Sequence, residues 1–220
     1  MKKIILIVIA LASNLALFAQ IDYAKQYRNA KDLFREGKYN LAMETFKPLI
    51  AYDQKNQYSP YASFYYALSA YKQGYDAVAK DMLLQLKNVH AKWEKMDEVN
   101  LWLAMIYFRN KDYFQGVKTL NAIQDKKQSD YIKRLKEQYL SQITDAETLR
   151  MMLEEYPNDD VVAKILARTI AKDLSDEENK KTLESLIERF KLERSDFIPE
   201  APGTFYKERY SVSVLLPFML

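Results

Sequence analysis

Three pairs of an aromatic residue followed by a cation recur at a fixed distance along the chain. Each pair lies 37 residues after the one before: Phe34–Arg35, Tyr71–Lys72 and Phe108–Arg109. An aromatic ring offers a large contact area at a small cost in side-chain entropy, and a cation offers charge-assisted hydrogen bonds to carboxylates. The pattern therefore predicts a groove for an extended peptide that carries acidic groups or a free carboxylate.

Other aromatic residues would enlarge this groove: Phe64, Tyr65 and Trp102, with Tyr61 beside them. The alternative interpretation is that the rings only pack between neighbouring helices and that the cations are solvated.

Residues that commonly perform catalysis are scarce. The chain has one histidine, His90, and no cysteine, so the usual spacings of a metal site or of a cysteine nucleophile do not occur. Its four glycines, at positions 37, 74, 116 and 203, are too widely spaced for a phosphate-binding loop. Acidic pairs such as Glu154–Glu155 lie at predicted helix ends or on polar helix faces, where a capping or solvated role is sufficient. We therefore expect no enzymatic activity, no metal site and no cofactor.

Helices are expected to position the aromatic–cation pairs. Only 4 glycines and 6 prolines occur among 220 residues, and 49% of the residues are hydrophobic, which indicates a helix-rich globular fold. The sequence repeats itself every 37 residues between residues 23 and 128. Small residues recur at two positions of the repeat and large apolar residues at two others: Ala30, Ala67 and Ala104; Ala42, Ala79 and Gly116; Phe46, Leu83 and Leu120; Leu49, Leu86 and Ile123. Each repeat is therefore predicted to be two antiparallel helices that approach closely at the small residues, with a turn at Gly37, Gly74 or Lys111.

The segment from Leu33 to Ala42, followed by Phe46, resembles a tetratricopeptide repeat. That family has small residues at its eighth and twentieth positions and a large apolar residue at its twenty-fourth, and repeats counted from Tyr23, Pro60 and Asp97 meet all three conditions. The chain departs from the family in its period, which is 37 residues instead of 34, and in lacking the usual Trp at the fourth position and the usual final proline. The resemblance implies an all-α superhelix of helix-turn-helix repeats over residues 20–128, whose first helices line a concave, partner-binding surface.

Residues 129–194 are predicted to form diverged helical hairpins that close the solenoid. Ser129 or Asp130 is expected to cap a helix that runs to residue 143, and Asp159 or Asp160 a helix that runs to residue 174. Two capping boxes, Thr144-x-x-Glu147 and Ser175-x-x-Glu178, are predicted to begin the two remaining helices.

The N-terminus has the pattern of a secretory signal peptide. Lys2 and Lys3 precede a short apolar run that ends at the small residue Ala19, and this run is shorter than the roughly 20 residues needed to span a bilayer. We expect cleavage of residues 1–19 and export to the periplasm or outer membrane of a Gram-negative bacterium, with no integral membrane span in the mature chain.

Charge is distributed unevenly along the mature chain. Residues 21–144 carry a net charge of +6 and residues 145–220 one of −5. Because the two halves nearly cancel, nucleic acid is not expected as a partner.

The last residues change in character. Residues 195–209 contain Pro199, Pro202 and Gly203 and indicate a linker, and residues 210–220 predict a short C-terminal β-strand stub. This stub, which contains the sequence Leu-Leu-Pro, resembles the first strand of a periplasmic type 1 ligand-binding domain. The resemblance implies that residues 210–220 begin a truncated second domain. The alternative is a strand that docks on the helices or joins another subunit.

The sequence is compatible with two functions. The first is an exported, non-catalytic scaffold that binds peptides or protein partners in the cell envelope. The second is an N-terminal helical arm of a periplasmic ligand-binding protein whose binding domain is missing from this chain.

Overall fold

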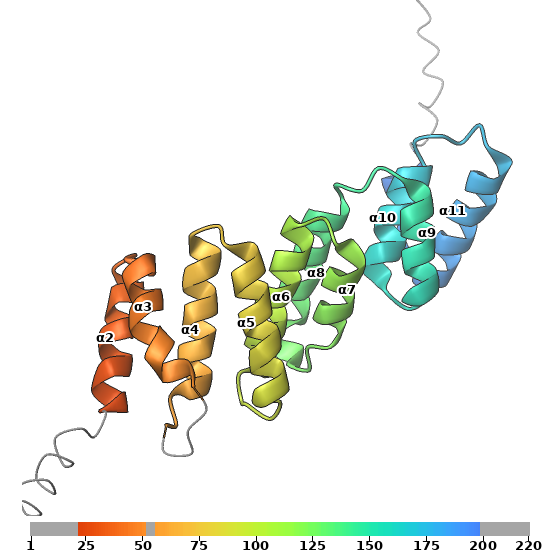
Figure 1. Cartoon of the computed structure of the whole chain (residues 1–220). Helices are drawn as coiled ribbons and strands as arrows, with labels where there is room; N and C mark the ends of the chain where they lie inside the picture. Colours follow the sequence, from red (N-terminus) through yellow and green to blue (C-terminus); the bar gives the residue numbers. More distant parts are fainter. Residues whose placement is uncertain (1–21, 52–55, 199–220) are drawn as a thin grey trace, which may run out of the picture. The chain divides into compact units, whose positions relative to one another are not determined.

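The computed structural model describes residues 22–51 and 56–198. Within these ranges the chain is built from α-helices and two short 3₁₀ turns, without a β-strand, so the predicted all-α fold is confirmed for this part (Figure 1). None of the helices in these ranges has the length and apolar character needed to cross a lipid bilayer. The predicted signal peptide, most of the predicted linker and the predicted strand stub lie outside the described residues.

The chain divides into two compact units, one up to Gln128 and one from Ser129 onwards, which we call unit 1 and unit 2. Unit 1 contains three helix pairs: α2 (Tyr23–Arg35) with α3 (Tyr39–Ile50), α4 (Ser59–Lys72) with α5 (Asp76–Val89), and α6 (Met96–Arg109) with α7 (Tyr113–Asn121). Each helix packs against the next one along the chain, and α2 also contacts α4. Successive first helices end 37 residues apart, and successive second helices begin 37 residues apart, so the helix boundaries follow the period of the sequence.

The same turn joins the two helices of every pair in unit 1. Gly37, Gly74 and Lys111 adopt left-handed backbone conformations, with φ of 75°, 81° and 61°. In each turn the amide of the following residue donates to the carbonyl five residues earlier at 2.9 Å, as from Lys38 to Leu33. This is a Schellman motif, which satisfies the last carbonyls of the first helix. Glycine adopts this conformation without steric cost, whereas Lys111 does not.

The small residues of the repeat lie where the helices approach closely. All five alanines of the pattern are fully buried, and so are the large residues beside them except Ile123, which is half-buried. Gly116 takes the place of alanine in the third pair because Phe108 fills the space: a Cβ atom on Gly116 would lie 2.4 Å from the Phe108 ring. The packing predicted from the repeat is therefore confirmed at these positions.

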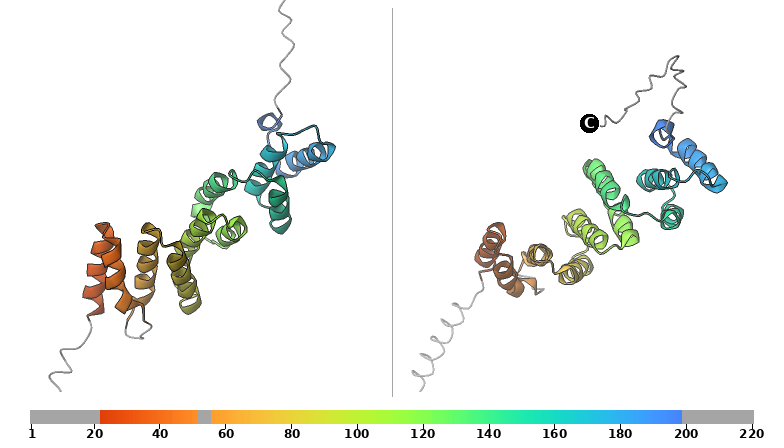
Figure 2. Two further views of the ribbon diagram at one scale, coloured as in Figure 1. Left: turned by 45° about the horizontal axis from the view of Figure 1, so that its top comes forward. Right: turned by 90° about the horizontal axis from the view of Figure 1, so that it is seen from above.

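Unit 2 is organised around α10. It contains α8 (Ser129–Leu140), α9 (Ala146–Glu155), α10 (Asp160–Ile170) and α11 (Glu177–Phe190), and a 3₁₀ turn at Arg194–Asp196. Helix α10 packs against α8, α9 and α11, and Figure 2 shows α9, α10 and α11 gathered together. The folded part continues past residue 194 because the ring of Phe197 is buried. Residues 195–198, assigned to a linker from the sequence, therefore belong to the helical fold.

Aspartate side chains begin three helices of unit 2, α9, α10 and α11. Asp145 accepts hydrogen bonds from the amides of Glu147 and Thr148 at 3.3 and 2.9 Å, and Asp176 accepts one from Glu178 at 2.8 Å. The predicted caps, Thr144 and Ser175, were therefore wrong by one residue. A carboxylate has two oxygens and makes stronger charge-assisted bonds to the helix amides than a hydroxyl does.

Two helices of unit 2 are shorter than predicted. Helix α8 ends at Leu140 instead of residue 143, and α10 ends at Ile170 instead of residue 174. After each end the amides bond to carbonyls three residues back, as from Ile143 to Leu140 at 3.0 Å. The apolar pattern continues through these tighter turns, since Ile143 remains buried, and this continuation made the helices look longer in the sequence.

Candidate functional site

The three aromatic–cation pairs lie at equivalent places, the C-terminal ends of α2, α4 and α6. A cation in the last turn of a helix is favoured by the helix dipole whatever its function. The surroundings of the three pairs differ, and these differences decide which residues a partner can reach.

Several of the predicted groove residues are packing residues of unit 1. Phe64 and Phe108 are only 3% and 2% exposed, so neither offers a ring to a partner. Phe34 is half-buried and meets the edges of the Tyr39 and Tyr65 rings at 5.6 and 5.2 Å between centroids. Phe34 thereby joins the first helix pair to the second, whereas Phe108 packs within its own pair.

Arg109 is engaged inside unit 1. Its guanidinium lies 4.0 Å above the centroid of the Tyr71 ring, and its Nε donates to Oδ2 of Asp76 at 2.5 Å. Trp102 forms an edge-to-face contact with Tyr71, with ring centroids 5.2 Å apart. The Arg109 charge is therefore balanced by Asp76, and the residues Tyr71, Trp102 and Arg109 form one packed group.

The other two predicted cations are more accessible. Arg35 is exposed and forms a solvent-screened pair with Asp32 at 3.3 Å. Lys72 is also exposed, and no ion pair of Lys72 is found within the described ranges. The three predicted cations thus lie at equivalent helix ends, but Arg35 and Lys72 can be reached by a partner more easily than Arg109 can.

The structure brings together a second group, which we call the tyrosine patch: Tyr27, Lys31, Tyr61 and Tyr65. Tyr27 on α2 meets Tyr61 and Tyr65 on α4 at 6.1 and 6.4 Å between ring centroids. The Lys31 ammonium lies 5.8 Å from the centroid of Tyr27 and 5.2 Å from that of Tyr65. Tyr61, Tyr65 and Lys31 are half-buried, so each keeps part of its surface in solvent.

Tyr27 and Lys31 were not among the residues selected from the sequence. Their spacing of four residues, which places both on one helix face, was the available signal. It was overlooked because it is not repeated in the other helix pairs.

Hydrogen bonding and burial favour the protonated phenols of Tyr61 and Tyr27. The Tyr61 hydroxyl donates to Oε1 of Glu94; this bond raises the pKa of Tyr61 and lowers the pKa of Glu94. Burial raises the pKa of Tyr27. The phenols of Tyr61 and Tyr27 are therefore neutral at physiological pH.

Residues 22–51 and 56–198 contain no group of three or more histidine, aspartate or glutamate side chains arranged to hold a metal ion. The sequence matches no protein-family model, and no curated protein is significantly similar to it.

Proposed function

We propose that the protein is an exported, non-catalytic scaffold of tetratricopeptide-like helix pairs that binds an extended segment of a protein partner on the tyrosine patch. The observation that carries this proposal is the position of Lys31 over the buried ring of Tyr27 and the half-buried ring of Tyr65, which lie on adjacent helix pairs. Half-buried rings already held by their neighbours lose little entropy on binding.

The partner segment is proposed to be acidic. Lys31 contacts aromatic faces, and no ion pair of Lys31 is found among the described residues. A carboxylate of the partner that approaches Lys31 would gain a charge-assisted hydrogen bond without displacing a carboxylate of this chain. Lys72 and Arg35 add positive potential at the ends of α4 and α2, which favours approach of an acidic segment.

Capture from cell-envelope extract by the immobilised chain tests this function. We expect Lys31→Glu to lose the captured partners at physiological salt, because it reverses the charge at the centre of the patch. Lys118→Glu is the matched control, since Lys118 is exposed on α7 and makes the same change in net charge. Tyr61→Ala should weaken capture with less dependence on salt, because it removes contact area rather than charge. Unchanged capture by Lys31→Glu, with circular dichroism equal to that of the wild type, would contradict the proposal.

Export is tested separately. N-terminal sequencing of the protein recovered from the cell envelope should find a chain that starts at or near Gln20. A cytoplasmic protein that retains Met1 would contradict export. The capture experiment would still test partner binding on the tyrosine patch.

A further inference from the structure

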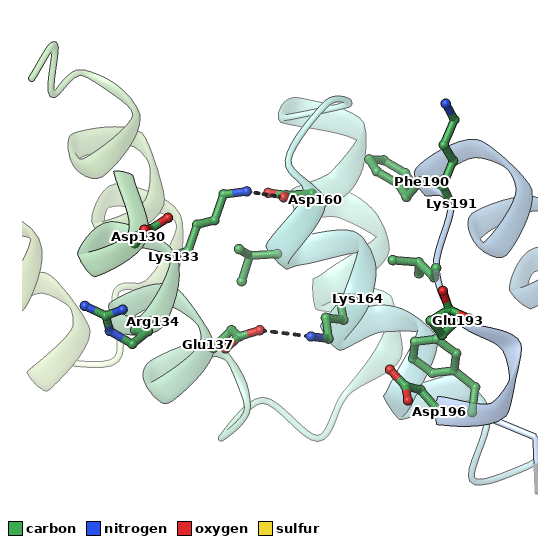
Figure 3. Close-up of a pocket in the computed structure, with 13 residues that line it drawn as sticks. Asp130, Lys133, Arg134, Glu137, Asp160, Lys164, Phe190, Lys191, Glu193 and Asp196 are labelled. Atoms are coloured by element: carbon green, nitrogen blue, oxygen red, sulfur yellow. Dashed lines mark hydrogen bonds and ion pairs between the residues drawn. The ribbon is translucent and has the colours of Figure 1, made fainter. Parts of the chain in front are cut away.

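Unit 2 contains a cavity of about 500 Å³ over one face of α10 (Figure 3). Helix α8 forms one wall, and the segment from Phe190 to Phe197 forms the other. The volume falls within the range of small-molecule sites, about 300–1,000 Å³, and is suited to a ligand of a few residues. This cavity is separate from the tyrosine patch, so the inference does not depend on the proposed function.

Two ion pairs cross from α8 to α10 at the cavity. Lys133 Nζ lies 2.6 Å from Asp160 Oδ2, and Lys164 Nζ lies 3.4 Å from Glu137 Oε1. Figure 3 shows the two pairs one above the other. All four side chains are at least a third exposed, so a ligand can reach both signs of charge.

Apolar residues complete the lining. Val161 of α10 and Phe197 are buried, and Phe190 and Leu192 are half-buried on the opposite wall. An apolar side chain placed here would lose contact with water on several sides.

The charges of the lining nearly cancel. Five acidic residues and four basic residues border the cavity: Asp130, Glu137, Asp160, Glu193 and Asp196; Lys133, Arg134, Lys164 and Lys191. A polyanion or a polycation would meet as much repulsion as attraction here. A zwitterion instead finds an opposite charge for each of its ends, because a ligand carboxylate can join a lysine and a ligand ammonium can join the glutamate or aspartate of a pair.

We propose that this cavity binds short peptides with free termini and an apolar side chain. The two termini pair with charges of the α8–α10 ion pairs, and the apolar side chain lies against Val161, Leu192 and Phe197. Recognition of both termini would distinguish a short peptide from an internal segment of a longer chain.

Isothermal titration of the full-length chain with the tripeptide Ala-Leu-Phe tests the proposal. We expect a Kd of about 1 mM or tighter for the zwitterion, and binding weaker by about tenfold or more when the termini are acetylated and amidated, since both charge-assisted contacts are lost. Equal affinity for the free and the blocked tripeptide would overturn the proposal, and so would the absence of binding by the free tripeptide at about 10 mM.

A double variant connects the binding to this cavity. Glu137→Gln with Lys164→Gln removes one charge of each sign, so net charge is kept and the melting temperature should barely change, because exposed ion pairs contribute little to stability. Affinity for the free tripeptide should fall by about tenfold. The matched control is Glu177→Gln with Lys180→Gln, an exposed pair on α11 that does not line the cavity. Equal loss of affinity in the control, or none in the cavity variant, would overturn the assignment.

Discussion

The two units of this protein are both helical but differ in how regularly their helices are connected. In unit 1 the pairs are joined by one repeated backbone turn, whose central residue has a positive φ at Gly37, Gly74 and Lys111. In unit 2 the connections differ from each other, and α9, α10 and α11 each begin at an aspartate that accepts from the first amides of the helix. The difference is one of regularity, because Asp112 also caps α7 in unit 1 and Lys191 ends α11 of unit 2 with a positive φ, but only in unit 1 does the same turn join the helices of every pair.

The cores of the units differ in the same way. Fully or nearly buried aromatic residues occur throughout unit 1: Tyr27, Phe46, Phe64, Trp93 and Phe108. The buried residues described in unit 2 are aliphatic or methionine, apart from Phe197, and unit 2 adds a buried ion pair between Lys136 and Asp159. Aromatic residues that fill the core of unit 1 also reach its surface, which is why the tyrosine patch lies there.

Asp159 is predicted to be the most sensitive polar residue of unit 2. Its side chain is 5% exposed, pairs with Lys136 at 2.5 Å and caps α10 through the amides of Val161 and Val162. Asp159→Ala should lower the free energy of unfolding by about 3 kcal/mol, because it removes a cap and takes the carboxylate away from a buried cation. Urea denaturation measures this loss. Asp160→Ala, at the exposed pair next to it, should cost well under about 1 kcal/mol; equal losses would contradict the prediction.

Gly116 is predicted to be the most sensitive small residue of unit 1. Gly116→Ala should destabilise the chain by about 1–2 kcal/mol, because the new Cβ overlaps the Phe108 ring and this outweighs the better helix propensity of alanine. Thermal unfolding measures the loss. Adding Phe108→Leu should recover part of the stability, since the smaller side chain vacates that space. If Phe108→Leu instead lowers the stability further and the two losses add, the overlap of the Cβ with the Phe108 ring is not the cause.

The helix starts of unit 2 are predicted to depend on aspartate. Asp176→Ala should cost about 1 kcal/mol of stability, because the first amides of α11 lose their acceptor. Ser175→Ala should have nearly no effect, since Ser175 is exposed and its hydroxyl donates to Asp173 outside the helix. Chemical denaturation of the two variants compares them directly. A larger loss of stability for Ser175→Ala than for Asp176→Ala would instead show that Ser175 caps α11, as the sequence predicted.

The third turn of unit 1, at Lys111, is predicted to be less stable than the two turns with glycine. Lys111→Gly should stabilise the chain by up to about 1 kcal/mol, because glycine adopts a φ of 61° without strain. The reverse change, Gly74→Lys, should cost about 1 kcal/mol at the equivalent turn. Melting temperatures of the two variants should move in opposite directions. Movement in the same direction would mean that the side chain of Lys111, rather than its backbone, decides the stability of this turn.

Much of unit 1 could be predicted because its signals are local and repeated. The 37-residue period located the turns, the helix ends and the small buried residues, since each of these depends on a residue type at a fixed place in the repeat. Unit 2 has no such repetition, so its helix ends were misplaced by one to four residues. A single Ser or Thr cannot be distinguished from a neighbouring Asp as the cap until the backbone is known.

The candidate site was predicted less well than the fold. Phe34, Tyr71 and Phe108 occupy the same position of the 37-residue repeat. Phe108 is nevertheless buried beside Gly116, whereas Tyr71 lies beneath the guanidinium of Arg109. Whether a ring faces solvent depends on neighbours from other helices, which the spacing along one helix does not contain.

The sequence by itself determined that the described part of this protein is helical, where three helix pairs turn, and which small residues let the helices approach. These properties follow from backbone preferences and from the apolar period of each segment. Only the tertiary structure decided that Asp76 neutralises Arg109, that Lys31 lies over Tyr65, and that two ion pairs of α8 and α10 border a cavity. These contacts join residues 27 to 34 positions apart in the chain, and their geometry is set by how whole helices pack.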